Sequence, residues 1–397
     1  MAIEMADGHD RPSVAIVAHE IHDTGGMERV LAELIRRLHP EWRVVVIASD
    51  VAVDLRPLVD WRRVRVPRRP FPLRFLLFFV LGSLRLARTR TDLVHSCGAI
   101  VANRVEVATV HFCHAGFREA TGALAPKSAS PIRRANTTVA RALALLAERW
   151  SYRPRRVRVL AAVSRGVAAE LVRHYPSVPV RMTPNGVDVE CFGPDAGTRD
   201  RVRRELDVAP GVLVALFVGG DWESKGLAMA IKGTAIARKR IPELELWVVG
   251  QGQEARFRDL AERAGVAERV RFFSSRADVS RFCQAADIFI LPTAYETFSL
   301  VAHEAAACGL PVVATRVSGI EELVGDDDAG ILAARTPEAM GEALACLAAD
   351  EALRQSMGNE GRRRASALTW EGSAAAVIGL YDSLLPGSRR LTRELRN

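Results

Sequence analysis

Residues 286–305 read ADIFILPTAYETFSLVAHEA, and this stretch contains the most informative pattern in the chain. The apolar run before Pro292 predicts a buried strand, and the segment from Ser299 onward predicts a helix that opens with small and polar residues. Two glutamates, Glu296 and Glu304, stand eight positions apart across the turn. Glu296 belongs to the predicted loop and Glu304 lies about one turn inside the helix, so both can face a ligand at the helix N-terminus.

The backbone amides at the start of this helix are expected to bind an anion. The amides of Phe298, Ser299 and Leu300 have no partner within a helix, and the helix dipole adds positive potential there. A carboxylate pair beside such a site fits a ligand with both hydroxyls and phosphates, such as a nucleotide sugar. The alternative is an ordinary strand–helix junction with two solvated glutamates.

A family resemblance favours the first interpretation. The two glutamates at this spacing, followed by residues 309–315 (GLPVVAT), resemble the signature of the family 4 retaining glycosyltransferases. The resemblance implies the GT-B fold of the α/β class. In that fold two Rossmann-like domains with parallel sheets face each other across a cleft, and a C-terminal helix crosses back to the first domain.

The length and composition agree with a globular protein of two domains. The chain has 397 residues, of which 49% are hydrophobic and 26% charged, and this length is comfortable for two domains. The six cysteines form no CxxC pair, which argues against a zinc site and fits a reducing cytosol. Residues 1–11 are polar and partly acidic without an apolar segment, so no signal peptide is expected.

The net charge of +8 is unevenly distributed along the chain. Residues 1–190 hold 29 Lys and Arg against 18 Asp and Glu, a net charge of +11, and residues 191–397 carry a net −3. A basic N-terminal half suggests that one domain meets an anionic surface. Nucleic acid is the first alternative, but the chain lacks a recognisable nucleic-acid module and is only 6% aromatic. Anionic lipid is therefore preferred, and no nucleic acid is expected as a partner.

The order of apolar and amphipathic runs predicts two parallel sheets. Runs typical of strands alternate with runs typical of helices from residue 13 to residue 332, the rhythm of βαβ units. Strands are predicted at residues 13–18, 43–48, 93–96, 105–110, 159–162, 212–218, 245–249, 270–273, 288–291 and 312–314.

These elements divide the chain into two predicted domains. Residues 12–184 are expected to form an N-terminal Rossmann-like acceptor domain, and residues 212–369 a C-terminal Rossmann-like nucleotide-sugar donor domain. Residues 185–211 are rich in Gly, Pro and Asp and are predicted as a linker. The family carries the segment Pro-Asn-Gly-Val-Asp, here residues 184–188, at its interdomain junction. Residues 370–385 resemble the family's C-terminal helix, which returns to the N-terminal domain.

Residues 71–86 form an apolar stretch that suggests contact with a membrane. Its uninterrupted apolar part, residues 75–81, is far shorter than the ~20 residues needed to span a bilayer. The stretch is surrounded by Arg68, Arg69, Arg74, Arg85, Arg88 and Arg90. An apolar face with arginines around it suits a helix that lies in the membrane interface. The alternative is an ordinary helix of a Rossmann-like domain.

A glycine pair follows the first predicted strand. Gly25 and Gly26 open the first predicted helix, and glycines there allow the backbone to approach a ligand closely. In the resembled family the Gly-Gly loop sits beside the donor diphosphate and the acceptor, which implies that role for this pair. Two further glycines, Gly250 and Gly252, resemble the family's Gly-x-Gly turn near the nucleobase.

The turn after the first strand of the second domain contains Lys225. It is not a Walker A loop, because Gly226 rather than Ser or Thr follows the lysine. The family places an Arg and a Lys in this turn to compensate the donor pyrophosphate, and Lys225 matches the Lys. The Arg is absent, with Gly220 and Ser224 at its expected positions, and Arg276 is a candidate substitute. This turn also resembles that of the lipopolysaccharide-core glucosyltransferases.

Two histidines follow the predicted strand at residues 105–110. The family has a histidine at this strand end, near the transferred sugar; His111 is the better match and His114 a second candidate, and the alternative is an ordinary loop histidine. No carboxylate or third ligand stands at a spacing suitable for a metal. Residues 326–328 (DDD) lie in a polar loop, so no catalytic metal and no cofactor are expected.

The resemblance implies a retaining hexosyltransferase in which Glu296, Lys225 and His111 are the catalytic residues. Glu304 would bind the ribose hydroxyls, and Glu296 those of the donor sugar. Lys225 and the amides of residues 298–301, which include Leu300 and Val301, would stabilise the leaving diphosphate. No carboxylate is placed as a covalent nucleophile, so the leaving phosphate itself is expected to accept the proton of the acceptor, in contrast to the two-carboxylate scheme of glycoside hydrolases.

The expected partners are a nucleotide sugar, a glycan or lipid-linked acceptor of cell-envelope or lipopolysaccharide-type biosynthesis, and an anionic membrane. The expected location is the cytoplasm, at the inner face of the membrane. Alternatives are a soluble small-molecule acceptor or a non-catalytic protein that binds nucleotide sugars. A phosphorylase of the same fold would need a much longer chain, and a sugar-phosphate epimerase lacks the glutamate pair.

Overall fold

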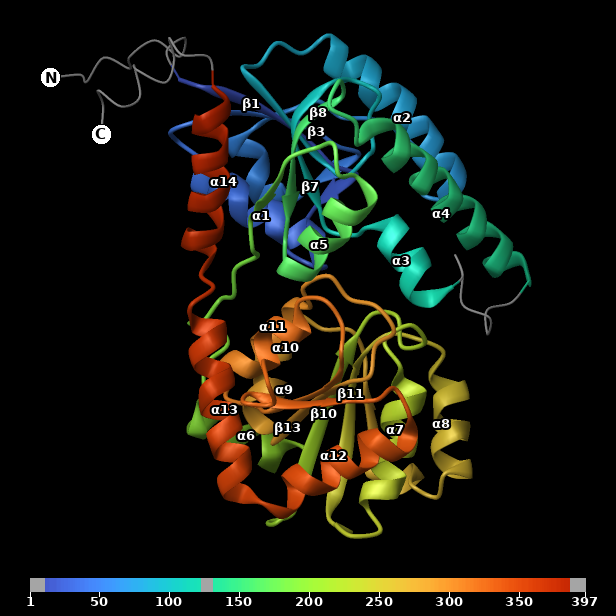
Figure 1. Ribbon diagram of the computed structural model, residues 1–397. Coiled ribbons are helices and arrows are strands. Elements are labelled where there is room, and N and C mark those ends of the chain that lie inside the picture. The colour runs from blue at the N-terminus through green and yellow to red at the C-terminus, as the bar shows by residue number, and fades with distance from the viewer. Residues whose placement is uncertain (1–10, 123–130, 386–397) are drawn as a thin grey trace, which may run out of the picture. The chain divides into compact units, whose positions relative to one another are not determined.

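The computed structural model describes residues 11–122 and 131–385, and the chain divides into two compact units (Figure 1). Unit 1 takes residues 1–163, 167–184 and 370–397, and unit 2 takes residues 164–166 and 185–369. The chain therefore leaves unit 1, builds unit 2, and returns to unit 1. The N-terminal residues 1–10, on which the expectation about a signal peptide depends, lie outside the described part.

Unit 1 is built on a parallel sheet of seven strands in the order β5-β3-β1-β6-β7-β8-β9. The strands are β1 (Ser13–Val17), β3 (Arg43–Ile47), β5 (Asp60–Trp61), β6 (Leu93–Cys97), β7 (Val105–Val110), β8 (Val157–Ala162) and β9 (Val180–Met182). A separate short pair is formed by β2 (Glu20–Ile21) and β4 (Asp50–Val51). The helical elements are α1 (Met27–Leu38), η1 (Val53–Leu58), α2 (Phe71–Ala87), α3 (His114–Thr121), α4 (Pro131–Ser151), α5 (Arg165–His174) and α14 (Trp370–Leu384).

Unit 2 is built on a parallel sheet of six strands in the order β12-β11-β10-β13-β14-β15. The strands are β10 (Leu213–Gly219), β11 (Leu244–Gly250), β12 (Val270–Phe273), β13 (Ile288–Leu291), β14 (Val312–Thr315) and β15 (Gly330–Ala333). The helical elements are α6 (Ala196–Glu205), α7 (Leu227–Ala237), α8 (Glu254–Arg263), η2 (Ala267–Arg269), α9 (Val279–Ala285), α10 (Leu300–Ala307), α11 (Ile320–Val324), α12 (Pro337–Ala349) and α13 (Glu351–Ser366).

The composition of the central strands explains why both sheets are parallel and covered by helices. All five residues of β1 and all four of β13 are buried, because helices cover both faces of a parallel sheet and leave no polar face on its strands. The predicted α/β class with two parallel sheets is confirmed. In each sheet the strand order reverses beside the first strand, β1 or β10, and ligands of such sheets bind outside the carboxyl ends of the strands at this switch point.

The segment predicted as a linker, residues 185–211, instead belongs to unit 2. It contains α6, whose Val202 joins the apolar core of the unit. Two arginines of α6, Arg199 and Arg203, form ion pairs with Asp287 before β13 at 2.6 and 3.3 Å. The charged helix therefore packs largely through its arginines. Because these ion pairs join residues far apart in the chain, the sequence of α6 shows no apolar periodicity that would have predicted it.

The helix α14 lies in unit 1, although it follows unit 2 in the chain. Its Ala374, Val377 and Tyr381 join the core under β1 and β3. The hydroxyl of Tyr381 and Nδ1 of the buried His95 lie 2.5 Å apart, and Glu371 pairs with Arg37 of α1 at 2.6 Å. Apolar and polar contacts together attach the last helix to the first unit. None of the helices in the described ranges has the length and apolar character needed to cross a membrane.

Candidate functional site

Lys225 and Glu296 meet at the carboxyl edge of the sheet of unit 2. Neighbouring strands β10 and β13 run in the same direction, so the loops that follow them meet at the switch point. The amide of Ala294 donates to the carbonyl of Ser224 at 3.3 Å, and Nζ of Lys225 forms an ion pair with the carboxylate of Glu296. Both side chains are partly exposed, so the pair lies where a ligand can reach it.

The two loops can approach this closely because position 226 is a glycine. Gly226 has φ +83°, and a Cβ atom there would overlap the carbonyl oxygen of Pro292. Behind Pro292, the hydroxyl of Thr315 donates to the carbonyl of Thr293 at 2.6 Å. An arginine that sequence reasoning missed, Arg335, also donates to the carbonyl of Pro292 at 3.0 Å. These bonds hold the loop that carries Glu296 in one place.

The start of α10 is uncapped. Its N-cap residue Ser299 adopts a left-handed conformation with φ +64° and makes no side-chain capping bond; its buried hydroxyl has no partner among the described residues. Left-handed backbone in a residue other than glycine is uncommon and often marks a functional site. The first amides, including those of Leu300 and Val301, have no acceptor within the helix. They are therefore suited to an anion.

A glycine and a histidine hold the backbone in front of α10. A Cβ atom on Gly319, which has φ +78°, would overlap the backbone of Phe298. The ring of Phe298 stacks on that of His303 at 4.0 Å. Nδ1 of His303 donates to the carbonyl of Ser299 at 3.0 Å, and burial lowers the pKa of His303 to about 4. Sequence reasoning missed this neutral histidine, for which the only signal was its place beside Glu304.

Glu304 lies within α10 and is only 3% exposed. A carboxylate in such surroundings discriminates strongly between groups that donate hydrogen bonds and groups that do not. The structure therefore gathers Glu296, Phe298, Ser299, Leu300, Val301 and Glu304 on one loop and helix start, with Lys225 against the loop.

Gly250 and Gly252 have packing reasons of their own. Gly250 ends β11 with φ +135°, and a Cβ atom there would overlap the carbonyl oxygen of Gly219. A Cβ atom on Gly252 would overlap the ring of the buried Trp222. Both glycines let the loop after β11 lie close to the loop after β10, at the same edge of the sheet as Lys225. Their contact with a nucleobase stays a prediction.

The position of the missing family arginine is open. A Cβ atom at Gly220 would meet open space, with no atom beyond its chain neighbours within 4 Å. The suggested substitute Arg276 is held by both carboxylate oxygens of Asp278, at 2.5 and 2.8 Å, and lies over the ring of Phe282. Arg276 is thus committed to its own loop.

The aspartates at positions 326–328 serve the local structure. Asp327 accepts from the amide of Leu332 at 3.0 Å, and Asp328 pairs with Arg364 at 2.8 Å. Across residues 11–122 and 131–385, no three His, Cys, Asp or Glu side chains gather in a way that could hold a metal ion.

In unit 1 the glycine pair lies at the start of α1. Gly26 is the N-cap residue and gives no side-chain bond, and a Cβ atom there would meet open space. At Gly25, which has φ +99°, a Cβ atom would meet the carboxylate of Glu28. Gly25 therefore has a backbone reason to be glycine, its positive φ, and Gly26 leaves room for a ligand to approach α1.

The two histidines after β7 have different surroundings. Burial lowers the pKa of His111 to about 4, so the ring is neutral at pH 7 and suits a sugar hydroxyl better than a phosphate. His114 begins α3, and its Nδ1 lies 2.7 Å from the buried carboxylate of Glu148. Glu148 also accepts from the amide of His114 at 2.9 Å and from the hydroxyl of Tyr175 at 3.0 Å. His114 therefore has a structural partner within unit 1.

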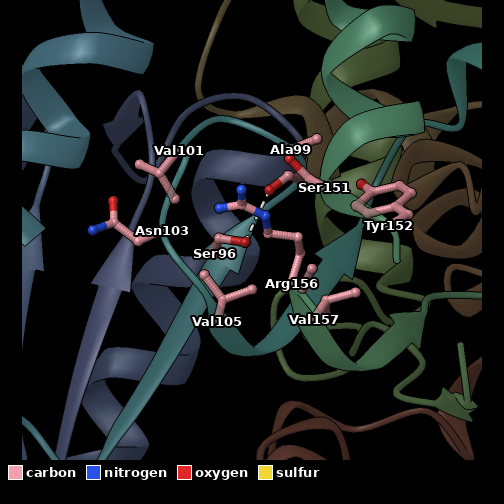
Figure 2. A pocket seen from close by; sticks show the side chains of 11 residues that line it. Ser96, Ala99, Val101, Asn103, Val105, Ser151, Tyr152, Arg156 and Val157 are labelled. Atoms are coloured by element: carbon pink, nitrogen blue, oxygen red, sulfur yellow. Dashed lines mark hydrogen bonds between the residues drawn. The ribbon is translucent and has the colours of Figure 1, made fainter. Parts of the chain in front are cut away.

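A small cavity in unit 1 lies apart from these residues (Figure 2). Its wall includes Ser96, whose hydroxyl donates to the carbonyl of Gly98 at 2.9 Å. Oδ1 of Asn103 and Oγ of Ser151 are buried without a partner among the described residues. Polar atoms of this kind suit an ordered water molecule. None of the candidate site residues lines this cavity.

The chain was compared with known protein families and curated proteins. Residues 24–191 match the family model "Glycosyltransferase Family 4", and residues 198–364 match "Glycosyl transferases group 1". The D-inositol 3-phosphate glycosyltransferase of Streptomyces bingchenggensis is 30% identical over 407 residues, which cover 93% of this chain and 87% of that protein. The chain belongs to the family 4 glycosyltransferases.

Another relative matches a smaller part of the chain, and solved structures match most of it. The D-inositol 3-phosphate glycosyltransferase of Corynebacterium glutamicum is 34% identical over 241 residues, and the match spans 57% of each chain. Among solved structures, that of WaaG, a glycosyltransferase involved in lipopolysaccharide biosynthesis, superposes with a TM-score of 0.77 at 23% identity, covering 92% of this chain and 99% of that one. Anabaena HepE with UDP-glucose gives a TM-score of 0.69 at 18% identity, covering 94% and 99%. These superpositions show the GT-B fold.

Proposed function

We propose that this family 4 glycosyltransferase moves a hexose from a nucleoside diphosphate to a hydroxyl group and retains the anomeric configuration. The observation that carries the proposal is the meeting of Lys225 and Glu296 beside the uncapped start of α10. A cation, a carboxylate and free helix amides at one point match a ligand that carries phosphates and hydroxyls.

Each of these groups has a part in the proposed reaction. The buried carboxylate of Glu304 accepts hydrogen bonds from the ribose hydroxyls, and that of Glu296 accepts them from the donor sugar. Lys225 and the first amides of α10 stabilise the negative charge that grows on the leaving diphosphate. Groups fixed in advance at the point where charge develops lower the barrier without reorganisation. The amide at Gly26 and the neutral ring of His111, both in unit 1, are assigned to the donor phosphates and the transferred sugar.

The proposed retention rests on the resemblance to retaining glycosyltransferases. Because this assignment places no carboxylate as a covalent nucleophile, retention requires attack on the face that the diphosphate leaves. As the bond between the anomeric carbon and the diphosphate lengthens, the acceptor hydroxyl attacks the same face of the sugar. Its proton passes to the departing phosphate oxygen. Charge neutralisation by Lys225 and backbone amides makes a divalent ion unnecessary, so the proposed reaction needs neither metal nor cofactor.

The proposed acceptor is a glycan or lipid-linked hydroxyl of cell-envelope or lipopolysaccharide-type biosynthesis, reached by a cytoplasmic enzyme at the inner face of the membrane. Support comes from the net charge of +11 in residues 1–190 and from the apolar outer side of α2. A second candidate acceptor is a small phosphorylated polyol, which the names of the curated relatives favour.

The test is incubation of the full chain with a panel of nucleotide sugars, with and without acceptors of both classes, while the released nucleotide is measured. We expect release from one nucleotide sugar and an axial or equatorial product linkage that matches the donor, read from the NMR coupling constant of the anomeric proton. An inverted linkage would refute retention. Binding of a nucleotide sugar without any release in the presence of acceptors would support a non-catalytic binding protein.

A further inference from the structure

The helix α2 carries two apolar stripes on opposite sides. The inner stripe, Phe75, Phe78, Gly82 and Leu86, is buried against unit 1. The second stripe, Leu73, Leu76, Val80 and Leu84, has the same spacing of three, four and four residues and points away from the first, because a shift of two residues turns an α-helix by about 200°. We call these four residues the outer stripe. They are 45–55% exposed.

Most of the large apolar side chains that are exposed on the described part of the chain lie together on α2 and its neighbour α4. Eleven large apolar side chains are exposed among the described residues; six of them belong to α2 and two to the neighbouring α4. The two helices pack side by side in unit 1 (Figure 1). Single exposed apolar residues are common on proteins, but a contiguous patch marks a contact surface. A helix that is apolar on all sides is covered on all sides in its working state.

The charges around the outer stripe are of one sign. Residues 61–91 contain nine arginines and no Asp, Glu or Lys. Arg63, Arg65, Arg68 and Arg69 are exposed before α2, and Arg85, Arg88 and Arg90 are exposed at its end. Two of the nine are held by acidic partners: Arg74, in the first turn, pairs with Glu20 at 2.7 Å, and Arg62 pairs with Asp60 at 3.1 Å. Exposed cations thus lie at both ends of an apolar face.

We propose that α2 is an interfacial helix that docks unit 1 on an anionic lipid bilayer. The outer stripe would lie at the boundary of the acyl chains, and the arginines at both ends would meet the phosphates of the lipid headgroups. A second copy of this chain is the less suitable occupant, because two such surfaces would bring together arginines without acidic partners. The inner stripe keeps α2 packed on unit 1, so the helix, about 25 Å long, lies along the surface.

The inference names the surface through which the proposed function would reach a lipid-linked acceptor, and in that sense it rests on the proposed function. Lipid binding itself is measured without turnover, however. Nucleotide release with a water-soluble acceptor is measured without vesicles. The two can therefore fail separately.

The experiment is co-sedimentation of the full chain with vesicles of phosphatidylcholine alone or of equal parts phosphatidylcholine and phosphatidylglycerol, at low and high salt. We expect binding to the anionic vesicles that weakens but persists at high salt, because the apolar contribution is insensitive to salt. The triple variant Leu76→Gln, Val80→Gln and Leu84→Gln should weaken this binding by more than about tenfold. Removal of Arg68, Arg69 and Arg88 should weaken it at low salt on the order of 5-fold per arginine.

The matched control is the triple variant Val53→Gln, Val172→Gln and Met182→Gln, which removes three apolar side chains exposed elsewhere on unit 1. It should bind vesicles as the unaltered chain does, and both triple variants should keep the unfolding temperature and the nucleotide release measured without vesicles. The inference is overturned if the unaltered chain does not bind anionic vesicles at low salt. It is also overturned if both triple variants lose binding equally, or if the outer stripe proves to mediate dimerisation instead.

Discussion

The helices α3 and α10 each begin after a strand of their sheet, but the first backbone amides of the two helices differ in their partners. At α3, the buried carboxylate of Glu148 accepts from the amides of His114 and Ala115, at 2.9 and 3.3 Å. At α10, Ser299 supplies no capping bond, and the carboxylates of the site stand to the side of the helix start or inside the helix.

The difference teaches where a Rossmann-like unit can take an anion. The positive end of a helix attracts one negative group, and in unit 1 this group is part of the chain. Burial, together with the charge of Glu148, raises the pKa of the nearby Cys113 thiol to about 12. In unit 2 we propose that a ligand supplies the negative group. The α3 junction is thus a structural joint, and the α10 junction is the proposed phosphate site.

The largest expected effect comes from removing the charges at the α10 junction. Lys225→Ala and Glu304→Gln should each lower turnover of the nucleotide sugar by about 10–150-fold, because a hydrogen bond to a charged group is worth about 1.5–3 kcal/mol. Released nucleotide is the measurement. Glu342→Gln, an exposed position on α12, is the control and should leave turnover unchanged. Two folded variants with the turnover of the unaltered chain would contradict the donor-site assignment.

The reverse pattern is expected at the α3 junction. Glu148→Gln should lower the free energy of unfolding by about 1–3 kcal/mol, because an amide presents a donor to groups that need an acceptor. The affinity for the nucleotide sugar in unit 2 should not change. Chemical denaturation and equilibrium binding measure the two effects. The control is Glu119→Gln, which breaks exposed pairs with Arg173 and His174 and should leave the free energy of unfolding close to that of the unaltered chain, because exposed ion pairs contribute little. If Glu148→Gln lowered the affinity for the nucleotide sugar, the α3 junction would not be purely structural, and the proposed contrast with the α10 junction would be wrong.

Two glycine positions test whether the backbone before α10 must stay where the structure has it. Gly319 and Gly265 both have positive φ, but only at Gly319 would a Cβ atom overlap backbone, that of Phe298. Alanine at either position brings backbone strain, because residues with a Cβ atom rarely adopt a positive φ. Gly319→Ala should cost at least about 1 kcal/mol more in thermal unfolding and should also lower donor turnover. Equal behaviour of the two variants would show that the backbone before α10 tolerates displacement.

The smallest expected effect is that of a chelator. Turnover should be unchanged in EDTA, because Lys225 and the amides of α10 are assigned the neutralisation of the leaving group. Assays with and without added magnesium or manganese measure this. If EDTA abolished turnover and either ion restored it, a metal ion would be needed to neutralise the leaving diphosphate at the α10 junction.

The sequence was informative where the structure depends on neighbours along the chain. Continuous apolar runs predicted ten of the thirteen strands of the two sheets, since buried parallel strands have no polar face, and missed the edge strands β5, β9 and β15. The glutamate spacing placed Glu296 and Glu304 on a loop and a helix. Contacts between distant segments were not visible. The pairing of Arg199 with Asp287, which ties α6 to unit 2, and the capping of α3 by Glu148 depend on side chains that only the folded chain brings together.

The backbone at Ser299 was hidden for another reason. Serine is an ordinary N-cap residue, and nothing in the sequence around Ser299 indicates a left-handed conformation. The conformation results from tertiary contacts, including the close approach of Gly319 to Phe298 and the bond from His303 to the carbonyl of Ser299.

The return of α14 to unit 1 bears on the order in which the chain is made. Tyr381 and Val377, which complete the core beside β1, leave the ribosome only after all of unit 2. At about 5–20 residues per second, the stretch from residue 184 to residue 370 takes roughly 10–40 s to synthesise. During this time unit 1 lacks the helix that covers one edge of its core, whereas unit 2 has its whole sequence by the end of it, before α14 is made. We therefore expect the second unit to reach its native state first, and the nascent first unit to be the one that chaperones protect.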